Sequence, residues 1–274
     1  MTSTLRTEIR GLVLARGPVM PPSGRALRYW LYQYKRTYKG SITTSFLYPV
    51  LYLAAMGLGL GSLVDHHVGS VDHVRYLVFL APGLLAATAM QIGGTEATYP
   101  VMGAIKWQRT YYAQLATPLR LVDVVIGHLG WIALRLITVT VIYLAVMAAF
   151  GTVLSPWALL AAPAGVLTGM AFATPIAAFA ATQQREAAFT TIYRMALVPL
   201  FLFSGTFFPV SQLPRWLHLV AFATPLYHGV ALCRDLALGQ LHPGADLVHG
   251  LYLLVLVAVG VWAAVRTFRR RLVV

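Results

Sequence analysis

Residues 204–239 read SGTFFPVSQLPRWLHLVAFATPLYHGVALCRDLALG, an apolar stretch that Pro209, Pro214 and Pro225 divide into short pieces. A helix rises about 1.5 Å per residue and needs about 20 residues to cross a bilayer, so pieces of roughly ten residues cannot span it. Such pieces enter the hydrocarbon only where protein or a water-filled cavity covers their broken backbone. The stretch therefore predicts a re-entrant helical hairpin at about 211–238.

The composition of the whole chain places this hairpin in an integral membrane protein. Of the 274 residues, 58% are hydrophobic and only 11% are charged, which lies outside the range of soluble globular domains. The long uncharged stretches predict an all-α fold with six transmembrane helices, preceded by a cytoplasmic N-terminus over 1–40 and followed by a basic cytoplasmic tail over 267–274. Within the transmembrane domain, 41–266, the expected spans lie near 41–64, 76–99, 121–150, 157–181, 188–209 and 247–266, with the hairpin between the last two.

The distribution of basic residues predicts the orientation of the chain. Lysines and arginines cluster before residue 40 and within 106–120, 185–194 and 266–271, and the positive-inside rule assigns these segments to the cytoplasm. An even number of spans then puts both termini on the cytoplasmic side of the plasma membrane. The net charge of +13 does not indicate a nucleic-acid partner, because the basic residues mark alternate loops and form no continuous surface.

The segment 25–39 has the pattern of an amphipathic helix. Apolar and aromatic residues recur at steps of three and four, while basic residues take the other face. The pattern predicts a helix in the inner membrane interface, with its cations near anionic lipid headgroups and its rings at the acyl boundary. The alternative is a basic flank that only fixes the orientation. The residues assigned to the interfacial helix are Leu27, Arg28, Trp30, Leu31, Tyr34 and Lys35.

Residues 102–120, between the second and third expected spans, read MGAIKWQRTYYAQLATPLR. Large aromatic and basic side chains in a helix-compatible segment are suited to docking, so a short cytoplasmic helix at about 103–116 is expected to bind a partner. The alternative is a solvated basic loop. A second, shorter inner loop around residue 184 could touch the same partner. The residues assigned to this coupling role are Lys106, Trp107, Arg109, Tyr111, Tyr112, Gln184 and Arg185.

The stretch ATYPVMGAIKWQRTYYAQLATPL at 97–119, the hairpin at 204–239 and the basic N-terminal helix together resemble the permease subunits of ABC exporters of the polysaccharide, lipo-oligosaccharide and anthracycline type. The resemblance covers essentially the whole chain. It implies that the N-terminal helix and 103–116 couple to an ATPase subunit, that two permeases form the pathway, and that the hairpin is part of an outer gate. The gate residues within 213–238 are then Pro214, Trp216, Pro225 and His228. Phe207, Phe208 and Pro209, at the outer end of the fifth span, are assigned to the same gate because aromatic rings there could close a path by excluding water, and the alternative is aromatic packing in an interfacial belt.

The chain contains no ATP-binding motif of its own. It lacks G-x-x-x-x-G-K-[ST], and its lysines, Lys35, Lys39 and Lys106, lie in no glycine-rich phosphate loop. We therefore expect a transport subunit without catalytic residues or cofactors of its own. Its transport is either passive or, as the resemblance implies, driven by a separate partner subunit that binds ATP and Mg²⁺. The other expected partners are membrane lipid and a second permease, either another copy of this chain or a related one.

Two of the charged residues in the expected spans, Glu96 and Arg135, are candidates for a site within the membrane. Glu96 approaches the membrane from the inner side at the end of the second span, and Arg135 lies well inside the third span. An ion in the bilayer is costly unless it is paired or in contact with water, and the two residues lie at similar depths. The sequence therefore predicts an intramembrane ion pair. The alternative is an arginine that extends to the interface or meets water in the pathway.

Histidines and aspartates gather in the first outer loop, which superficially suggests a metal site. Because the loop is short and contains glycine and serine, nothing in it fixes the ligands, and we expect an incidental polar loop without metal. The sole cysteine, Cys233, leaves no intrachain disulfide possible. The loop residues in question are Asp65, His66, His67, Asp72 and His73.

These features favour the permease half of an ATP-driven exporter that moves an amphiphile, such as a glycolipid, a lipid-linked saccharide or a lipophilic drug, outward. A membrane-embedded lipid-modifying enzyme would need acids, bases or metal ligands that converge at one depth, whereas the eight Asp and Glu residues are scattered. A secondary transporter is the other alternative, and no inverted repeat supports it.

Overall fold

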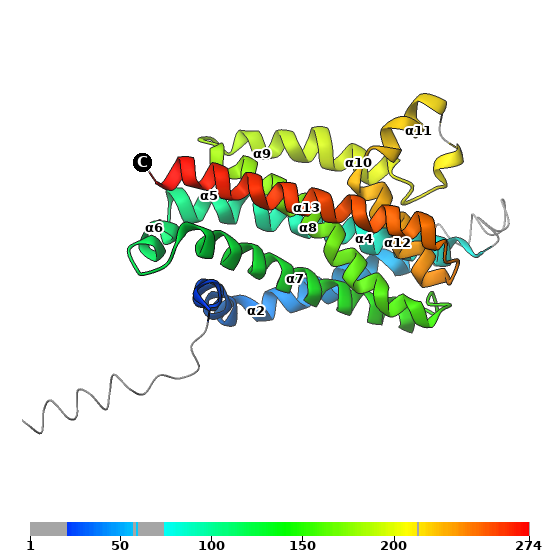
Figure 1. Cartoon of the computed structure of the whole chain (residues 1–274). Helices are drawn as coiled ribbons and strands as arrows, with labels where there is room; N and C mark the ends of the chain where they lie inside the picture. Colours follow the sequence, from blue (N-terminus) through cyan, green and yellow to red (C-terminus); the bar gives the residue numbers. More distant parts are fainter. Residues whose placement is uncertain (1–20, 57–58, 60–73, 213, 274) are drawn as a thin grey trace, which may run out of the picture.

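The structure is a computed structural model that describes residues 21–56, 59, 74–212 and 214–273. Among these residues no β-strand forms, and the long helices lie side by side in one bundle (Figure 1). The principal helices are α2 (Pro22–Ala54), α4 (Tyr76–Ala97), α5 (Tyr99–Lys106), α6 (Thr110–Leu115), α7 (Leu121–Ala149), α8 (Ala161–Thr182), α9 (Ala187–Ile192), α10 (Val198–Phe203), α11 (Arg215–Phe222), α12 (Pro225–Leu238) and α13 (Pro243–Leu272).

Four helical segments of the described chain are long and apolar enough to cross a membrane: Tyr76–Lys106, Leu121–Ala149, Pro156–Thr182 and Pro243–Leu272. They correspond to the second, third, fourth and sixth expected spans. The first expected span is described only in part, because most residues beyond α2 lie outside the described ranges. The count of six is therefore not confirmed, and the described helices give four spans, or five if the bent pair α11 and α12 is one span.

The helix expected at 188–209 is shorter than the sequence suggested. Helix α9, a π-helical turn (Tyr193–Leu197) and α10 follow one another over Ala187–Phe203, which is below the length of a full span. The helix ends at Phe203 because Gly205 adopts a left-handed backbone with φ 83°, which turns the chain away. The aromatic residues that follow, expected at the end of a span, lie in this turn.

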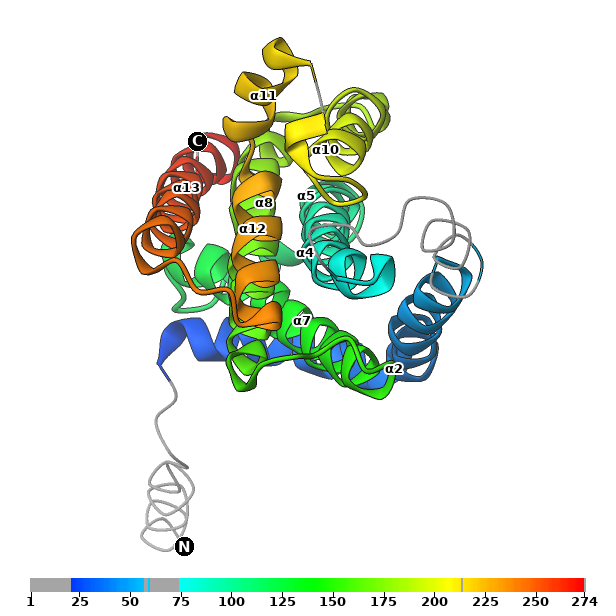
Figure 2. The ribbon, with the colours of Figure 1, turned by 90° about the vertical axis from the view of Figure 1, so that its right-hand side faces the viewer.

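Helix α2 joins two elements that the sequence analysis separated. Its first part, dark blue in Figures 1 and 2, crosses one end of the bundle perpendicular to the long helices, and the rest then turns to run along the bundle. This end also holds α6, and we call it the α6 end; the opposite end holds α11 and is called the α11 end. The expected boundary near residue 40 thus lies within one continuous helix.

The segment expected to form a hairpin consists of two helices of 8 and 14 residues, α11 and α12, which meet at an angle of 78°. At about 1.5 Å per residue they are roughly 12 and 21 Å long, so neither alone crosses about 30 Å of hydrocarbon. Pro225 occupies the first turn of α12, and the Thr224 side chain caps that helix by accepting a hydrogen bond from the Tyr227 amide.

The centre of the bundle is α8, which contacts α4, α7, α12 and α13. Glycines make these contacts close: a Cβ at Gly93 would meet the backbone of Gly169, and one at Gly229 would meet the side chain of Thr168. Small residues let helices approach without a hydrophobic driving force between them. As a result α12 is held firmly on α8, whereas α11 lies at the edge of the bundle (Figure 2).

Candidate functional site

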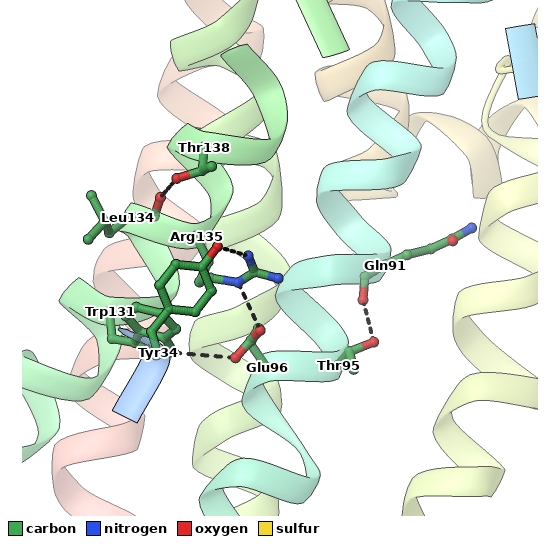
Figure 3. Close-up of polar contacts among 8 residues, drawn as sticks. All are labelled: Tyr34, Gln91, Thr95, Glu96, Trp131, Leu134, Arg135 and Thr138. Carbon is green, nitrogen blue, oxygen red and sulfur yellow. Dashed lines mark hydrogen bonds and ion pairs between the residues drawn. The ribbon is translucent and has the colours of Figure 1, made fainter. Parts of the chain in front are cut away.

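The residues expected to form an intramembrane ion pair lie side by side. Arg135 on α7 donates a hydrogen bond of 3.3 Å from Nε to Oε1 of Glu96, in the last turn of α4 (Figure 3). Their side chains are 10% and 20% exposed, so the pair is largely withdrawn from solvent. The structure thus brings together two residues that are 39 positions apart in the chain.

Two further residues complete this charged centre. Trp131 donates from its indole nitrogen to the second carboxylate oxygen of Glu96 at 3.4 Å, and Arg135 donates from Nη1 to the Tyr34 hydroxyl at 3.3 Å. Trp131 lies four residues before Arg135 and therefore on the same face of α7, a spacing that could have revealed its role. Sequence reasoning missed Trp131 and assigned Tyr34 to the membrane interface.

The charged centre joins α2, α4 and α7 next to a small cavity. The cavity has a volume of about 190 Å³ and is lined by Trp30, Gln33, Tyr34, Glu96, Pro100, Trp131 and Arg135. Desolvating an ion pair is costly, but removing one partner costs more, because the remaining charge is left uncompensated. Removal of either charge is therefore expected to destabilise the contact between α4 and α7.

The segment between α4 and α7 is broken where one helix was expected. Helix α5 ends after Lys106, residues 107–109 form a turn, and α6 starts at Thr110. Arg109 has a left-handed backbone with φ 51°, and the amides of Trp107 and Gln108 both donate to the Gly103 carbonyl, which closes the end of α5. The expected coupling helix at 103–116 is therefore two short helices, and the turn between them projects its side chains.

This turn exposes most of the residues assigned to coupling. The side chains of Lys106, Arg109 and Tyr112 are exposed, and the Trp107 side chain is 55% exposed. An open hollow of about 700 Å³ beside the turn is lined by Ile105, Lys106, Arg109, Tyr112 and Arg271. The surface formed by Lys106, Trp107, Arg109, Tyr112 and Gln184 is called the coupling surface below.

Tyr111 differs from its neighbours, and the expectation that it lies on a docking surface is wrong. Its side chain is 0% exposed, its hydroxyl shares a hydrogen bond of 2.7 Å with Nδ1 of His128, and its ring meets Phe268 at 5.4 Å. Burial raises the pKa of Tyr111 well above its ordinary value, so the phenol stays neutral. Tyr111 anchors α6 on α7 and α13 and is out of reach of a partner.

Gln184 connects the coupling surface to two other parts of the bundle. Its backbone carbonyl accepts a hydrogen bond of 2.7 Å from Lys106 Nζ, and its side-chain oxygen accepts one of 2.9 Å from Arg271. Arg185, beside it, is exposed. Gln184 was expected at the coupling surface from its place in a short inner loop. Arg271 was not, because the basic residues near the C-terminus indicated only the orientation of the chain.

The amphipathic helix is confirmed as two-faced, but its apolar face packs on protein. Trp30 is buried, with its ring 4.3 Å from that of His128, and the Tyr34 ring lies 5.1 Å from that of Trp131. The expectation that these rings lie at the acyl boundary is therefore wrong, since α7 provides a closer apolar surface. Leu27 and Leu31 are half-buried on the same side.

The opposite face of α2 carries the basic residues and is exposed. Arg28 donates a hydrogen bond of 2.8 Å to the Tyr32 hydroxyl, and the Lys35 ammonium lies 5.7 Å from the centre of the Tyr32 ring. The hydrogen bond and positive charge of Arg28 hold the pKa of Tyr32 below its ordinary value. This face is free to meet lipid headgroups or a partner.

The residues assigned to the outer gate do not form one cluster. Phe207, Phe208 and Pro209 are half-buried in the turn after α10, and the Phe207 ring meets that of Phe201 at 5.0 Å. Pro214 and Trp216 are exposed at α11, and Pro225 is half-buried at the start of α12.

His228 is the gate residue with the densest contacts. It is buried, and its ring stacks on that of Tyr252 at 4.0 Å. Its Nδ1 atom lies 2.7 Å from Nδ1 of His249, and its Nε2 atom lies 2.9 Å from the Phe222 carbonyl. Residues of α11 and α13 thus hold the start of α12.

No group of three or more His, Cys, Asp or Glu side chains that could hold a metal occurs within the described ranges. The polar cluster of the first outer loop lies outside those ranges, so its role stays a prediction. Cys233 is a free, buried thiol whose Sγ atom lies 3.7 Å from the Ala161 carbonyl.

Comparison with known proteins identifies the family of the chain. The family model for the ABC-2 type transporter matches residues 26–238. Nodulation protein J of Rhizobium leguminosarum bv. trifolii is 33% identical over 240 residues, which cover 87% of this chain and 89% of that protein. Nodulation protein J of Sinorhizobium fredii is 31% identical over 251 residues, or 89% and 94% of the two chains. The chain therefore belongs to the ABC-2 type transporter family and is a permease subunit of an ABC exporter.

Proposed function

We propose that this permease moves an amphiphile outward across the plasma membrane, driven by ATP that a separate nucleotide-binding subunit hydrolyses with Mg²⁺. The sequence resemblance to polysaccharide and lipo-oligosaccharide exporters favours a glycolipid or lipid-linked saccharide over a lipophilic drug. In this proposal the chain supplies the path and the coupling surface, and it supplies no catalytic residue or cofactor.

The observation that carries the proposal is the way the coupling surface is attached to the bundle. Large exposed side chains such as Trp107 and Tyr112 are typical of docking surfaces, and the cations beside them suit an acidic partner. Behind this surface, buried Tyr111 connects α6 to α7 and α13. A displacement of the turn by a partner would therefore reach the long helices directly.

The orientation and assembly follow from the same proposal. Both termini and the α6 end face the cytoplasm, where a soluble ATPase can reach the coupling surface, and the α11 end faces outward. The basic face of α2 lies beside anionic lipid headgroups. The functional unit is a pair of permeases, either two copies of this chain or one copy with a related chain, with the path between them.

Co-purification tests the proposal. Purified alone, the chain should hydrolyse no ATP; purified with its nucleotide-binding subunit, it should form a stable complex with ATPase activity. If the chain transports cargo with a proton or ion gradient and no ATPase, it is a secondary transporter. If it converts a lipid substrate without a partner, it is an enzyme. Either outcome would overturn the proposal.

A further inference from the structure

A second cavity lies at the α11 end, separate from the charged centre and the coupling surface. It has a volume of about 460 Å³, within the range of about 300–1,000 Å³ that is usual for small-ligand pockets. Its lining residues come from the turn after α10, from α11 and α12, from the residues after α12 and from the first turns of α13. In the ribbon, α11 and the turn after α10 lie at this end of the bundle (Figure 1). Its lining includes His218, Tyr227, Arg234, Asp235, Gln240 and His249.

Polar side chains outnumber apolar ones around this pocket, which is unusual for a chain that is 58% hydrophobic. A hydrocarbon chain placed there would remove ionised groups from water without replacing their hydrogen bonds, which is costly. The lining therefore disfavours the apolar part of an amphiphile and favours a ligand with many hydroxyl groups.

The charges of the lining balance each other. Arg234 donates from Nε to the Phe79 carbonyl at 3.2 Å and from Nη2 to the Gly205 carbonyl at 2.9 Å, and its guanidinium lies 3.8 Å from the centre of the Phe79 ring. Asp235, the next residue, contacts the His242 ring at 3.6 Å. One cation and one anion give no excess charge for a phosphate or an ammonium ion, so an uncharged ligand fits best.

The walls also offer the two kinds of contact that a sugar needs. The Phe222 and Tyr227 rings pack edge to face at 4.8 Å and give an apolar surface for the C–H groups of a sugar ring. The His218 imidazole and the Gln240 side-chain amide line the pocket, and both groups can form hydrogen bonds with ligand hydroxyls. The fixed position of Arg234 keeps the walls in place before a ligand arrives.

We propose that this pocket binds one or two sugar units of the exported amphiphile at the outer side of the permease. The inference rests on the proposed function, because it assigns to the pocket the polar part of the same cargo. The pocket would hold the saccharide by hydroxyl hydrogen bonds and ring contacts, while the acyl or polyprenyl part remains in lipid.

Saturation-transfer NMR on the full-length chain in phospholipid nanodiscs, free of sugar-based detergents, tests this proposal. Cellotetraose and maltotetraose are the probes, and tetraethylene glycol is the control for non-specific contact. We expect saturation transfer to the ring C–H protons of at least one tetrasaccharide and none to the glycol. The double variant His218→Ala with Gln240→Ala should weaken binding about tenfold, whereas Gln212→Ala, in the neighbouring turn but outside the pocket lining, should not change it.

Equal saturation transfer in the double variant and in the wild-type chain would overturn the proposal, and so would the absence of saturation transfer at millimolar tetrasaccharide. Displacement of the sugar by dodecylphosphocholine from the wild-type pocket would assign the pocket to an alkyl chain instead. The proposed function is tested by a different result. Sugar binding without ATP-driven transport would contradict the export proposal, whereas ATP-driven transport without sugar binding would contradict only the assignment of this pocket to a saccharide.

Discussion

The guanidinium of Arg135 lies 3.3 Å from the carboxylate of Glu96, and this contact joins α7 to the last turn of α4 immediately before the coupling segment begins. Tyr34 adds the first helix to the same centre through its hydroxyl. The ion pair thus connects three helices close to the surface where an ATPase would dock.

Substitution of one partner of this pair should lower the stability of the protein more than substitution of both partners. Glu96→Gln and Arg135→Gln should each destabilise the protein, because each leaves a charge uncompensated where water is scarce. The double variant should lose less stability than the sum of the two single losses. The difference, which is the interaction free energy of the pair, should be about 0.5–3 kcal/mol. Thermal unfolding in nanodiscs at matched expression measures the difference.

Glu96→Gln combined with Arg266→Gln is the matched control, because Arg266 lies over the Trp262 ring on α13 and forms neither an ion pair nor a hydrogen bond with Glu96. The two effects should add in that case. Additive effects in the Glu96 and Arg135 cycle as well would show that the observed contact contributes nothing, and Arg135 would then be a residue of a water-filled path.

Trp107→Ala and Tyr112→Ala should weaken binding of the nucleotide-binding subunit, since exposed aromatic rings at docking surfaces often contribute much of the affinity. We expect a loss of about tenfold for the pair of substitutions, or ~1.4 kcal/mol, with little change in folding. Binding to the immobilised ATPase subunit, measured by surface plasmon resonance, checks this.

Trp157→Ala, which removes a similarly exposed ring near the opposite end of the bundle, should leave this affinity unchanged. Tyr111→Ala should lower the unfolding temperature, because it empties a buried site. Unaltered affinity in the Trp107 and Tyr112 variant would place the docking surface elsewhere.

The contact between α12 and α8 should depend on the absence of a side chain at Gly229. An alanine there would meet Thr168, and overpacking of this kind costs about 1–3 kcal/mol. Adding Thr168→Ala should restore part of the lost stability. Gly250→Ala is the control, because nothing lies within 4 Å of its added Cβ. A Gly229→Ala variant as stable as the wild type would contradict the close contact of these helices.

Single cysteines should report the two ends of the bundle on opposite sides of the membrane. Cys233 is the sole cysteine of the sequence, so Cys233→Ala gives a background without thiols. In it, Leu219→Cys on α11 should react with an impermeant maleimide applied to intact cells, and Gln108→Cys should react only after permeabilisation. Labelling of residue 108 from outside would reverse the proposed orientation.

The lengths of the uncharged stretches were sufficient to predict four of the spans, and the spacing of the prolines was sufficient to predict the division of 211–238 into short helices. The similar depths of Glu96 and Arg135 indicated that they could pair, and the contact in the structure favours this over an arginine that extends to the interface or meets water. These features depend on local composition and on distance along a helix, which the sequence contains directly. The roles of the paired residues in transport stay proposals.

Contacts between distant segments could not be predicted in the same way. Tyr111 and Tyr112 are adjacent and chemically equal, and only the position of Phe268 and His128 in the fold decides that the first is buried. The break at Arg109 depends on a left-handed residue that propensity disfavours. The rings of Trp30 and Tyr34 fit a lipid interface and a protein surface equally well by their spacing alone.

The most direct test of the account is ATP-driven transport in proteoliposomes that contain the permease and its nucleotide-binding subunit, with a fluorescent lipid-linked oligosaccharide as cargo. Transport is measured as the fraction of cargo that reaches the leaflet on the side of the α11 end. We predict that this fraction rises with ATP and Mg²⁺ only when both subunits are present. Equal transport by the permease alone, or by the complex without ATP, would contradict the account.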